Sequence, residues 1–444
     1  MKKLTEVEVS DLWQHVVKDN TSLSTVDDQI VQVVYPGRPS DEPGADFKDA
    51  VLSIGGRLNK GDIEIHVKSS DWRTHHHHQN KTYNGIVLHV VMWHDSENVT
   101  RLENGNSIPM ISLDDHKTIT AVSRKICPPS LSCYLGNATD ISVEQIMDVL
   151  HRAGEARFRE KQSAFLGELK VTEAGQCLYR GIMGALGYSR NTIPFQMAAE
   201  KLPLHLLESI VQESPDEVIS TRLEAWLLGT AGFLPSQKAD NFLSIEGDMW
   251  IKTLEKEWQS CGGKQALSPE EWHLFRVRPG NFPARRLAGM AQLLLWYRKE
   301  GLLPGLSALV EEALQNDTWH KLEDGLMVTA ENYWKDHFAP GKKCQKLDPC
   351  LIGRARATEI IINVLLPFFT AHYECNGRGS IDAEAFRLYC DYPFATENTI
   401  VRHMRCQLGL KQSQIKSAWC QQGLLHLYKR FCTEGRCGEC PLVT

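Results

Sequence analysis

The chain has 444 residues, of which 42% are hydrophobic and 23% charged, and its formal net charge is -6 at pH 7. These values are typical of an ordinary globular protein with two or three domains. No run of 18 or more apolar residues occurs, so we expect no membrane span and no membrane partner.

The N-terminus is predicted to form an amphipathic helix. Thr5 and Glu8 have the spacing of a capping box, and the segment lacks the apolar core of a signal peptide. We therefore expect a cytoplasmic protein. The thirteen cysteines are scattered and odd in number, which fits no disulfide framework.

Residues 29 to 126 are predicted to be rich in β-structure. Short β-branched runs are separated by Gly, Pro, Asp and Asn, and one further strand is expected after the turn in ENGNSIPMISL. The runs are DQIVQVVYPG, DAVLSIGGRL, GDIEIHVKSS, GIVLHVVMW and HKTITAVSRKI.

A helical pattern begins at SVEQIMDVLHRAGEARF and continues through TRLEAWLLGTAGFL and PARRLAGMAQLLLW, with apolar residues three and four apart. The polar segment APGKKCQKLDPC suggests a boundary near Gly341. The predicted fold is α+β: a β-rich domain (1–135), a helical domain (136–340) and a basic helical region with a cysteine tail (341–444).

The segment from Lys60 to Asp95 holds seven of the seventeen histidines. Within GDIEIHVK, strand alternation places Asp62, Glu64, His66 and Lys68 on one face. A solvated strand face explains this row without any site. A row of ionisable groups is otherwise costly to bury unless the groups pair or bind a metal.

A second interpretation compares this row with the restriction-endonuclease-like core, which it resembles weakly. There an upstream acid and a strand Glu-x-Lys hold Mg²⁺ or Mn²⁺. Asp46 and Glu64 would be the metal ligands, His66 a ligand or base, and Lys68 would neutralise charge on a phosphate. His66 stands where that pattern has its lysine.

A third interpretation takes the histidines as ligands of Zn²⁺ or Mn²⁺. His66 and His89 lie on neighbouring predicted strands, and the RTHHHH loop supplies His75 to His78. A buried, hydrogen-bonded histidine in the core is the simpler explanation for His89, because its same-face neighbours are valines.

Two arginine-rich segments, RPGNFPARRLAGM and IGRARATEI, are candidate contacts for phosphate groups. Pairing with local acids explains them equally well. The basic balance of the C-terminal region, with 14 Lys and Arg against 9 Asp and Glu from Pro340 onward, permits a nucleic-acid partner. The candidate substrate-binding residues are Arg276, Arg278, Arg285, Arg286, Arg354 and Arg356.

The C-terminal run FCTEGRCGECPL places Cys432, Cys437 and Cys440 at a spacing that suits Zn²⁺ or part of an iron–sulfur cluster. It resembles the cysteine loop of helix-hairpin-helix DNA glycosylases, but a fourth cysteine after the proline is missing and no glycosylase catalytic motif precedes it. A reduced, metal-free loop is the alternative.

The whole chain resembles the bacterial domain-of-unknown-function family number 2851. The resemblance rests on PGADFKDAVLSIGGRLNKGDIEIHVKSSDW, EAWLLGTAGFL, RPGNFPARRLAGMAQLL and IGRARATEIIINVLLP. It implies a bacterial source and no particular activity.

The leading functional hypothesis is a metal-dependent nuclease that hydrolyses phosphodiester bonds. The alternatives are a non-catalytic binding or scaffold protein with a structural metal tail, and a histidine-ligated hydrolase of a small phosphoester.

Overall fold

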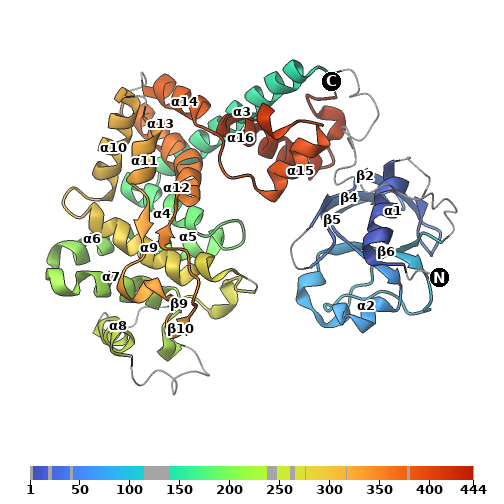
Figure 1. Ribbon diagram of the computed structural model, residues 1–444, viewed down its shortest axis with the longest axis horizontal. Helices are drawn as coiled ribbons and strands as arrows, with labels where there is room; N and C mark the ends of the chain where they lie inside the picture. Colours follow the sequence, from blue (N-terminus) through green and yellow to red (C-terminus); the bar gives the residue numbers. More distant parts are fainter. Residues whose placement is uncertain are drawn as a thin grey trace. The chain divides into compact units, whose positions relative to one another are not determined.

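The computed structural model describes residues 4–18, 23–40, 44–114, 141–237, 248–260, 266–275, 277–316, 318–377 and 381–443. Contacts divide the chain into two compact units. The first unit contains Met1–Glu155, Glu397–Lys416 and Cys420–Thr444, and the second contains Ala156–Thr396 and Ser417–Trp419. The α+β class is confirmed (Figure 1). Residues 341–444, which are predicted from the sequence to form one region, contribute to both units.

The first unit is built on a mixed sheet with the strand order β1-β2-β4-β5-β6-β7, and β3 pairs with β4. The pairs from β1 to β5 are antiparallel, whereas β5, β6 and β7 are parallel to one another. The elements are α1 (Glu6–Lys18), β1 (Leu23–Ser24), β2 (Ile30–Tyr35), β3 (Arg38–Pro39), β4 (Phe47–Ile54), β5 (Arg57–Lys68), α2 (Asp71–Thr74), η1 (His77–Gln79), η2 (Lys81–Tyr83), β6 (Ile86–Trp93) and β7 (Met110–Ser112).

Helix α1 begins at the predicted capping box, in which Thr5 N donates to Glu8 at 2.9 Å and Glu8 N donates to Thr5 Oγ1 at 3.4 Å. The helix lies across one face of the sheet (Figure 1). The core between helix and sheet includes Val9, Trp13, Val16, Val17, Phe47, Leu52, Ile63, Ile65, Leu88 and Val90. Because strand residues alternate, Glu64 and His66 point to the opposite face, where Trp72 of α2 is buried.

The predicted run DAVLSIGGRL is not one strand. Gly55 and Gly56 have φ of 56° and 79° and form the two-residue turn between β4 and β5. Positive φ at both turn positions matches the right-handed twist of a hairpin and favours glycine. The predicted strand HKTITAVSRKI lies outside the described residues.

The C-terminal segment returns to the sheet of the first unit. It contains α15 (Thr399–Gln407), η10 (Gln412–Gln414), α16 (Ala418–Leu427), the π-helical turn η11 (Tyr428–Cys432) and η12 (Cys437–Glu439). Tyr428 donates to Asp49 Oδ2 at 2.5 Å, and Tyr35 OH lies 2.7 Å from His403 Nε2. Through these hydrogen bonds, His403 contacts β2 and Tyr428 contacts β4.

The second unit is helical, with two small two-stranded sheets (Figure 1). Its hydrophobic core is formed by residues between Phe158 and Ala418 in the sequence. This core surrounds helix α9, which is almost completely buried. Its elements are α4 (Ala174–Leu186), α5 (Thr192–Lys201), α6 (Leu204–Glu213), α7 (Asp216–Thr230), η4 (Pro235–Gln237), α8 (Met249–Ser260), η6 (Pro269–Glu271), η7 (Pro279–Asn281), α9 (Pro283–Trp296), α10 (Leu302–Asn316), α11 (Trp319–Asp324), β8 (Val328–Thr329), η8 (Asn332–Lys335), β9 (His337–Ala339), β10 (Lys342–Lys343), β11 (Cys350–Ile352), α12 (Arg354–Ile360), the π-helical η9 (Ile361–Leu365), α13 (Leu366–Cys375) and α14 (Ile381–Asp391). The long helix α3 (Val143–Leu169) contributes residues to both units, with the division after Glu155.

Among the described residues, no helix has both the length and the apolar character needed to cross a membrane.

Candidate metal centre

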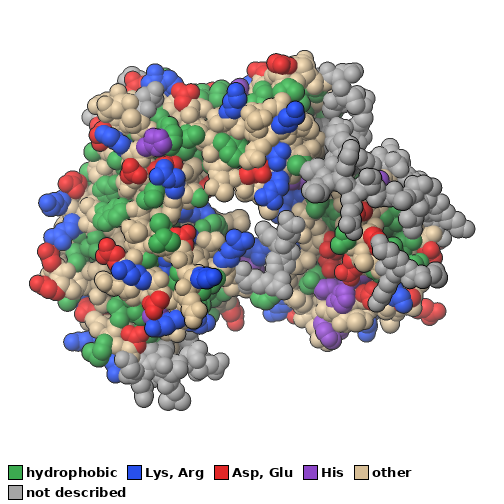
Figure 2. Space-filling view, in the orientation of Figure 1, with side chains coloured by type: hydrophobic (Ala, Val, Ile, Leu, Met, Phe, Trp, Pro, Cys, Tyr) green, Lys and Arg blue, Asp and Glu red, His purple; other side chains and the backbone are tan. Residues whose placement is uncertain are grey.

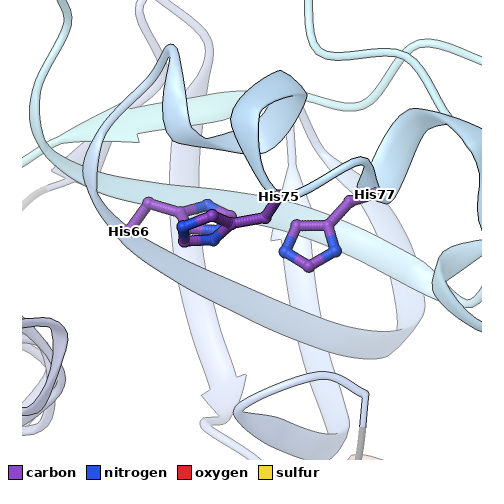
Figure 3. A group of neighbouring side chains, drawn as sticks. All are labelled: His66, His75 and His77. Carbon is purple, nitrogen blue, oxygen red and sulfur yellow. The ribbon is translucent and has the colours of Figure 1, made fainter.

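Three histidines converge on the face of the sheet opposite α1. One ligand nitrogen from each of His66, His75 and His77 lies within 4.8 Å of the others. His66 comes from β5, and the other two come from the loop after α2 (Figure 3). In the space-filling view, histidine side chains gather near acidic side chains at the surface of this unit (Figure 2).

The loop brings His75 and His77 to the same place because the chain turns between them. His76 has φ of 60°, in the left-handed region, and it immediately precedes η1. His77 is buried and packs against Tyr83 with ring centroids 3.9 Å apart, whereas His75 is exposed. The sequence indicated the loop but not which of its four histidines face His66.

His89 orients His66. His66 Nδ1 lies 2.9 Å from His89 Nε2, and His89 Nδ1 lies 3.0 Å from Thr100 Oγ1. When the Nδ1–H of His89 is donated to Thr100, its Nε2 accepts from His66, and the Nε2 lone pair of His66 is left for a ligand. That Nε2 atom is buried and has no hydrogen-bond partner. His89 therefore fixes the orientation of the His66 ring through this hydrogen bond.

Glu64 borders the histidine group. Its Oε1 lies 3.2 Å from His77 Nε2 and 3.8 Å from His66 Nε2, and its buried Oε2 has no hydrogen-bond partner. Asp46 directly precedes β4, as predicted, and its Oδ2 accepts from Ile65 N at 2.8 Å. The negative charge of Asp46 raises the pKa of Glu64, so the two predicted carboxylates lie near each other.

Burial favours the neutral forms of Glu64, His66, His77 and His89. Burial, with the nearby charge of Asp46, raises the pKa of Glu64 to about 9, and burial raises the pKa of Asp46 to about 6. Burial and the neighbouring imidazoles lower the pKa of His66 to about 2, of His77 to about 4 and of His89 to about 3. Neutral imidazoles are the form that binds metals, and a divalent cation would favour an ionised Glu64.

The donor set suits a transition metal. Imidazole nitrogens bind Zn²⁺ at about 2.0–2.1 Å, so ligands on a tetrahedral ion are separated by roughly 3.4 Å. Three imidazoles with one carboxylate favour Zn²⁺ or Mn²⁺, whereas Mg²⁺ prefers oxygen ligands.

A family model described as "Protein of unknown function (DUF2851)" matches residues 6–398. The chain belongs to this family. The match confirms the resemblance seen in the sequence, and it includes the histidine group but ends before the cysteine tail. No curated protein and no solved structure matches the chain.

The lysine whose charge acts on Glu64 is not the one at the end of the sequence motif. Lys68 closes β5, is half-exposed, and its Nζ lies 3.7 Å from Asp95 Oδ2. Lys48 of β4 lies 2.6 Å from Asp62 Oδ2, and its positive charge favours ionisation of Glu64. Strand pairing, which the local sequence does not reveal, brings Lys48 to the row on β5.

The predicted phosphate-binding arginines belong to the second unit. Arg278 is exposed, Arg354 pairs with the buried Glu323, and Arg276 lies outside the described residues. Arg285 is completely buried and donates to the carbonyls of Trp334, His337 and Asp348. Arg286 donates to Leu351 O and to Tyr188 OH, and Arg356 donates to Ala185 O.

The cysteine tail lies against the sheet of the first unit. Cys437 Sγ is 4.0 Å from Val34 O, and the buried Cys432 Sγ is 4.0 Å from the sulfur of Met404. Burial and the neighbouring thiols raise the pKa of both Cys432 and Cys437. No disulfide joins the described cysteines. The metal predicted for this tail stays a prediction.

Proposed function

We propose that the first unit is a metal-dependent phosphodiesterase, with nucleic acid as its substrate class and the cytoplasm as its location. The observation that carries the proposal is the pair of buried, unpartnered atoms, His66 Nε2 and Glu64 Oε2, beside the imidazoles of His75 and His77. A buried polar atom without a partner is costly, and a bound cation would satisfy both atoms.

The surrounding groups suit hydrolysis. A metal held by His66, His75 and His77 would supply an activated water and polarise a phosphoryl oxygen. Glu64 would be a further ligand or accept a proton from that water. Asp46 would add a second carboxylate beside Glu64. Lys48 would offset negative charge on the phosphate. The order Asp46, then Glu64 on the next strand, is the order that suggested a nuclease from the sequence.

The first test is metal content, because it does not depend on finding a substrate. Full-length protein would be loaded with Zn²⁺ or Mn²⁺, dialysed, and analysed by mass spectrometry for bound metal. We expect about one ion per chain, and less than a tenth of that in His66→Ala and in His77→Ala, since each removes a ligand. His76→Asn is the matched control, because Asn tolerates the left-handed conformation and His76 lies outside the group.

The second test is cleavage of single- and double-stranded DNA and RNA with Mn²⁺, Zn²⁺ or Mg²⁺, with Glu64→Gln as the variant. Loss of cleavage in the variant, at least about 100-fold, supports the proposed role. Turnover of bis(p-nitrophenyl) phosphate without cleavage of any nucleic acid would favour a hydrolase of small phosphoesters. Bound metal without any turnover would leave a non-catalytic metal-binding unit and contradict the proposal.

A further inference from the structure

In the second unit, three arginines lie near a tyrosine and an asparagine. We call this group the Tyr188 cluster; its members are Tyr188, Asn281, Arg285, Arg286 and Arg356. Arg286 Nη2 donates to Tyr188 OH at 2.9 Å and to Asn281 Oδ1 at 2.8 Å, and Tyr188 OH donates to the same Asn281 oxygen at 2.8 Å. Three segments that are distant in the sequence therefore meet around one phenol ring.

Arg356 covers that ring. Its guanidinium carbon lies 3.3 Å from the centroid of Tyr188, while that of Arg286 lies 5.5 Å from it. Stacking of this kind holds a guanidinium plane in a fixed orientation. Tyr188 itself has φ of 56°, a conformation that is strained for a bulky residue and is found most often at functional sites.

The arginines of the cluster form no direct ion pair, although the charge of Asp348 acts on Arg285 and Arg286. Among the described residues, no Asp or Glu oxygen lies within 4.0 Å of the guanidinium nitrogens of Arg285, Arg286 or Arg356. Other arginines of the same unit do have one, for example Arg222 with Glu257 at 2.7 Å and Arg298 with Asp216 at 3.0 Å. Arg285 and Arg286 are 0% and 5% exposed, and buried charges are ordinarily paired.

Unused donors remain at this cluster. The Nε atoms of Arg286 and Arg356 are buried without a hydrogen-bond partner. Arg356 uses only Nη1, which donates to Ala185 O at 2.8 Å, and Asn281 uses only its oxygen. The nitrogens Arg356 Nη2 and Asn281 Nδ2 make no hydrogen bond with any described residue. A ligand with several acceptor oxygens and a negative charge would satisfy these donors.

We propose that the Tyr188 cluster is an oxyanion site that binds a phosphate group, with Arg356 and Asn281 contacting the oxygens and Arg286 and Arg285 supplying positive charge. Planar guanidinium groups bind phosphate through two parallel hydrogen bonds, which suits the fixed plane of Arg356. The phosphate could come from a small phosphate ester or from a nucleic-acid backbone. This site does not depend on the activity of the first unit.

The test is calorimetric titration of the metal-free, full-length protein in EDTA with two probes, pyrophosphate and a twelve-nucleotide single-stranded DNA. Wild type, Arg356→Gln and Arg356→Lys would be compared with Arg298→Gln, which removes a surface arginine of the same unit. We expect at least about tenfold weaker binding in Arg356→Gln, an intermediate loss in Arg356→Lys, and less than twofold change in the control.

The two probes separate the sources of the phosphate. Binding of pyrophosphate that is lost in Arg356→Gln assigns the site to a small phosphate ester, and binding of the oligonucleotide alone assigns it to a backbone; both support the site. Equal binding by wild type and Arg356→Gln, or no binding of either probe, overturns it. Thermal unfolding in chloride guards against a folding defect, because removal of an uncompensated charge should leave the midpoint of Arg356→Gln unchanged or raised. Should Arg356→Gln not fold, Arg356→Lys and Tyr188→Phe decide in its place.

Discussion

Lys48 extends from β4 to Asp62 Oδ2 at 2.6 Å, on the row of β5 that also carries Glu64 and His66. Lys68, although it lies on the same strand as Glu64, is directed to Asp95 at the strand end. In a hydrolase of phosphodiesters, the cation closer to the carboxylates is the one placed to offset charge on the phosphate.

We therefore predict that Lys48→Met lowers the cleavage rate on the order of 100-fold, the size expected when one stabilising charge is lost. Lys68→Met, the matched control, should stay within about twofold of wild type, since an exposed ion pair contributes little. Initial rates on a labelled oligonucleotide measure both. Bound metal should be unchanged in either variant, and a defect in Lys68→Met alone would reverse the assignment.

Glu224 of α7 is a buried carboxyl in the second unit, where its Oε1 accepts from Trp334 Nε1 at 3.1 Å. Burial raises its pKa from 4.5 to about 8. The native state thus holds it neutral while the unfolded chain ionises it. The stability it contributes is complete below pH 4.5 and is lost as the pH rises toward 8.

Glu224→Gln keeps the acceptor for Trp334 and removes this titration. We predict that the variant exceeds wild type in free energy of unfolding at pH 8, on the order of 2 kcal/mol, and that the difference shrinks toward pH 5. Urea unfolding at several pH values measures it. Glu312→Gln, at an exposed position, should show no such trend, and a difference independent of pH would show that Glu224 is ionised in the folded protein.

At the site, the residue types could be predicted but their roles could not. Alternation on β5 correctly brought Glu64 and His66 to one face. The choice of His75 and His77 depends on the left-handed turn at His76, which a run of four identical residues does not specify. His89 was a candidate ligand beside His66, but its nitrogens are engaged with His66 and Thr100, as the alternative of a buried, hydrogen-bonded histidine expected.

At the scale of elements, the turn Cys432-Thr433-Glu434-Gly435 lies close to the sheet. Gly435 has φ of 68°, and a Cβ added there would come 2.8 Å from Val51 Cγ1 and 3.2 Å from Val34 Cγ1. Both the conformation and the lack of space require glycine at this position. The cysteine tail is therefore fixed to β2 and β4 by close packing as well as by hydrogen bonds.

We predict that Gly435→Ala loosens the tail, at a cost of about 1–3 kcal/mol from strain and overpacking. Hydrogen exchange measured by mass spectrometry should show faster exchange in η11 and η12. Gly438→Ala is the control in the same tail, because an added Cβ there meets nothing within 4 Å. Equal exchange in the two variants would mean that the tail is not held at Gly435.

Strands β2, β5 and β6 could be predicted because they are short β-branched runs between turn residues, and β5 also alternates apolar and polar residues. The pairing of Tyr428 with Asp49 could not, because it joins residues 379 positions apart. Nor could the burial of Arg285 and Arg286, since all acceptors of Arg285 and one acceptor of Arg286 are main-chain carbonyls, which every sequence offers equally.

At the scale of the whole molecule, the first unit is discontinuous, with its sheet at the start of the chain and its last helices at the end. We predict that deletion of residues 420–444 destabilises this unit selectively. Amide protection should fall in β2 and β4, which lose the contacts of Tyr428 and Gly435, and should persist in α9 of the second unit. Equal loss of protection in both units would show that they unfold together.

The discontinuity also has a consequence for synthesis. Between Glu155 and Glu397 the ribosome must add almost all of the second unit, about 240 residues, which takes roughly 10 to 50 s at ordinary rates of translation. During that interval the sheet exists without the segment that packs on Val34 and Val51. A nascent chain thus presents an incomplete apolar surface to chaperones until residues 420–444 have emerged.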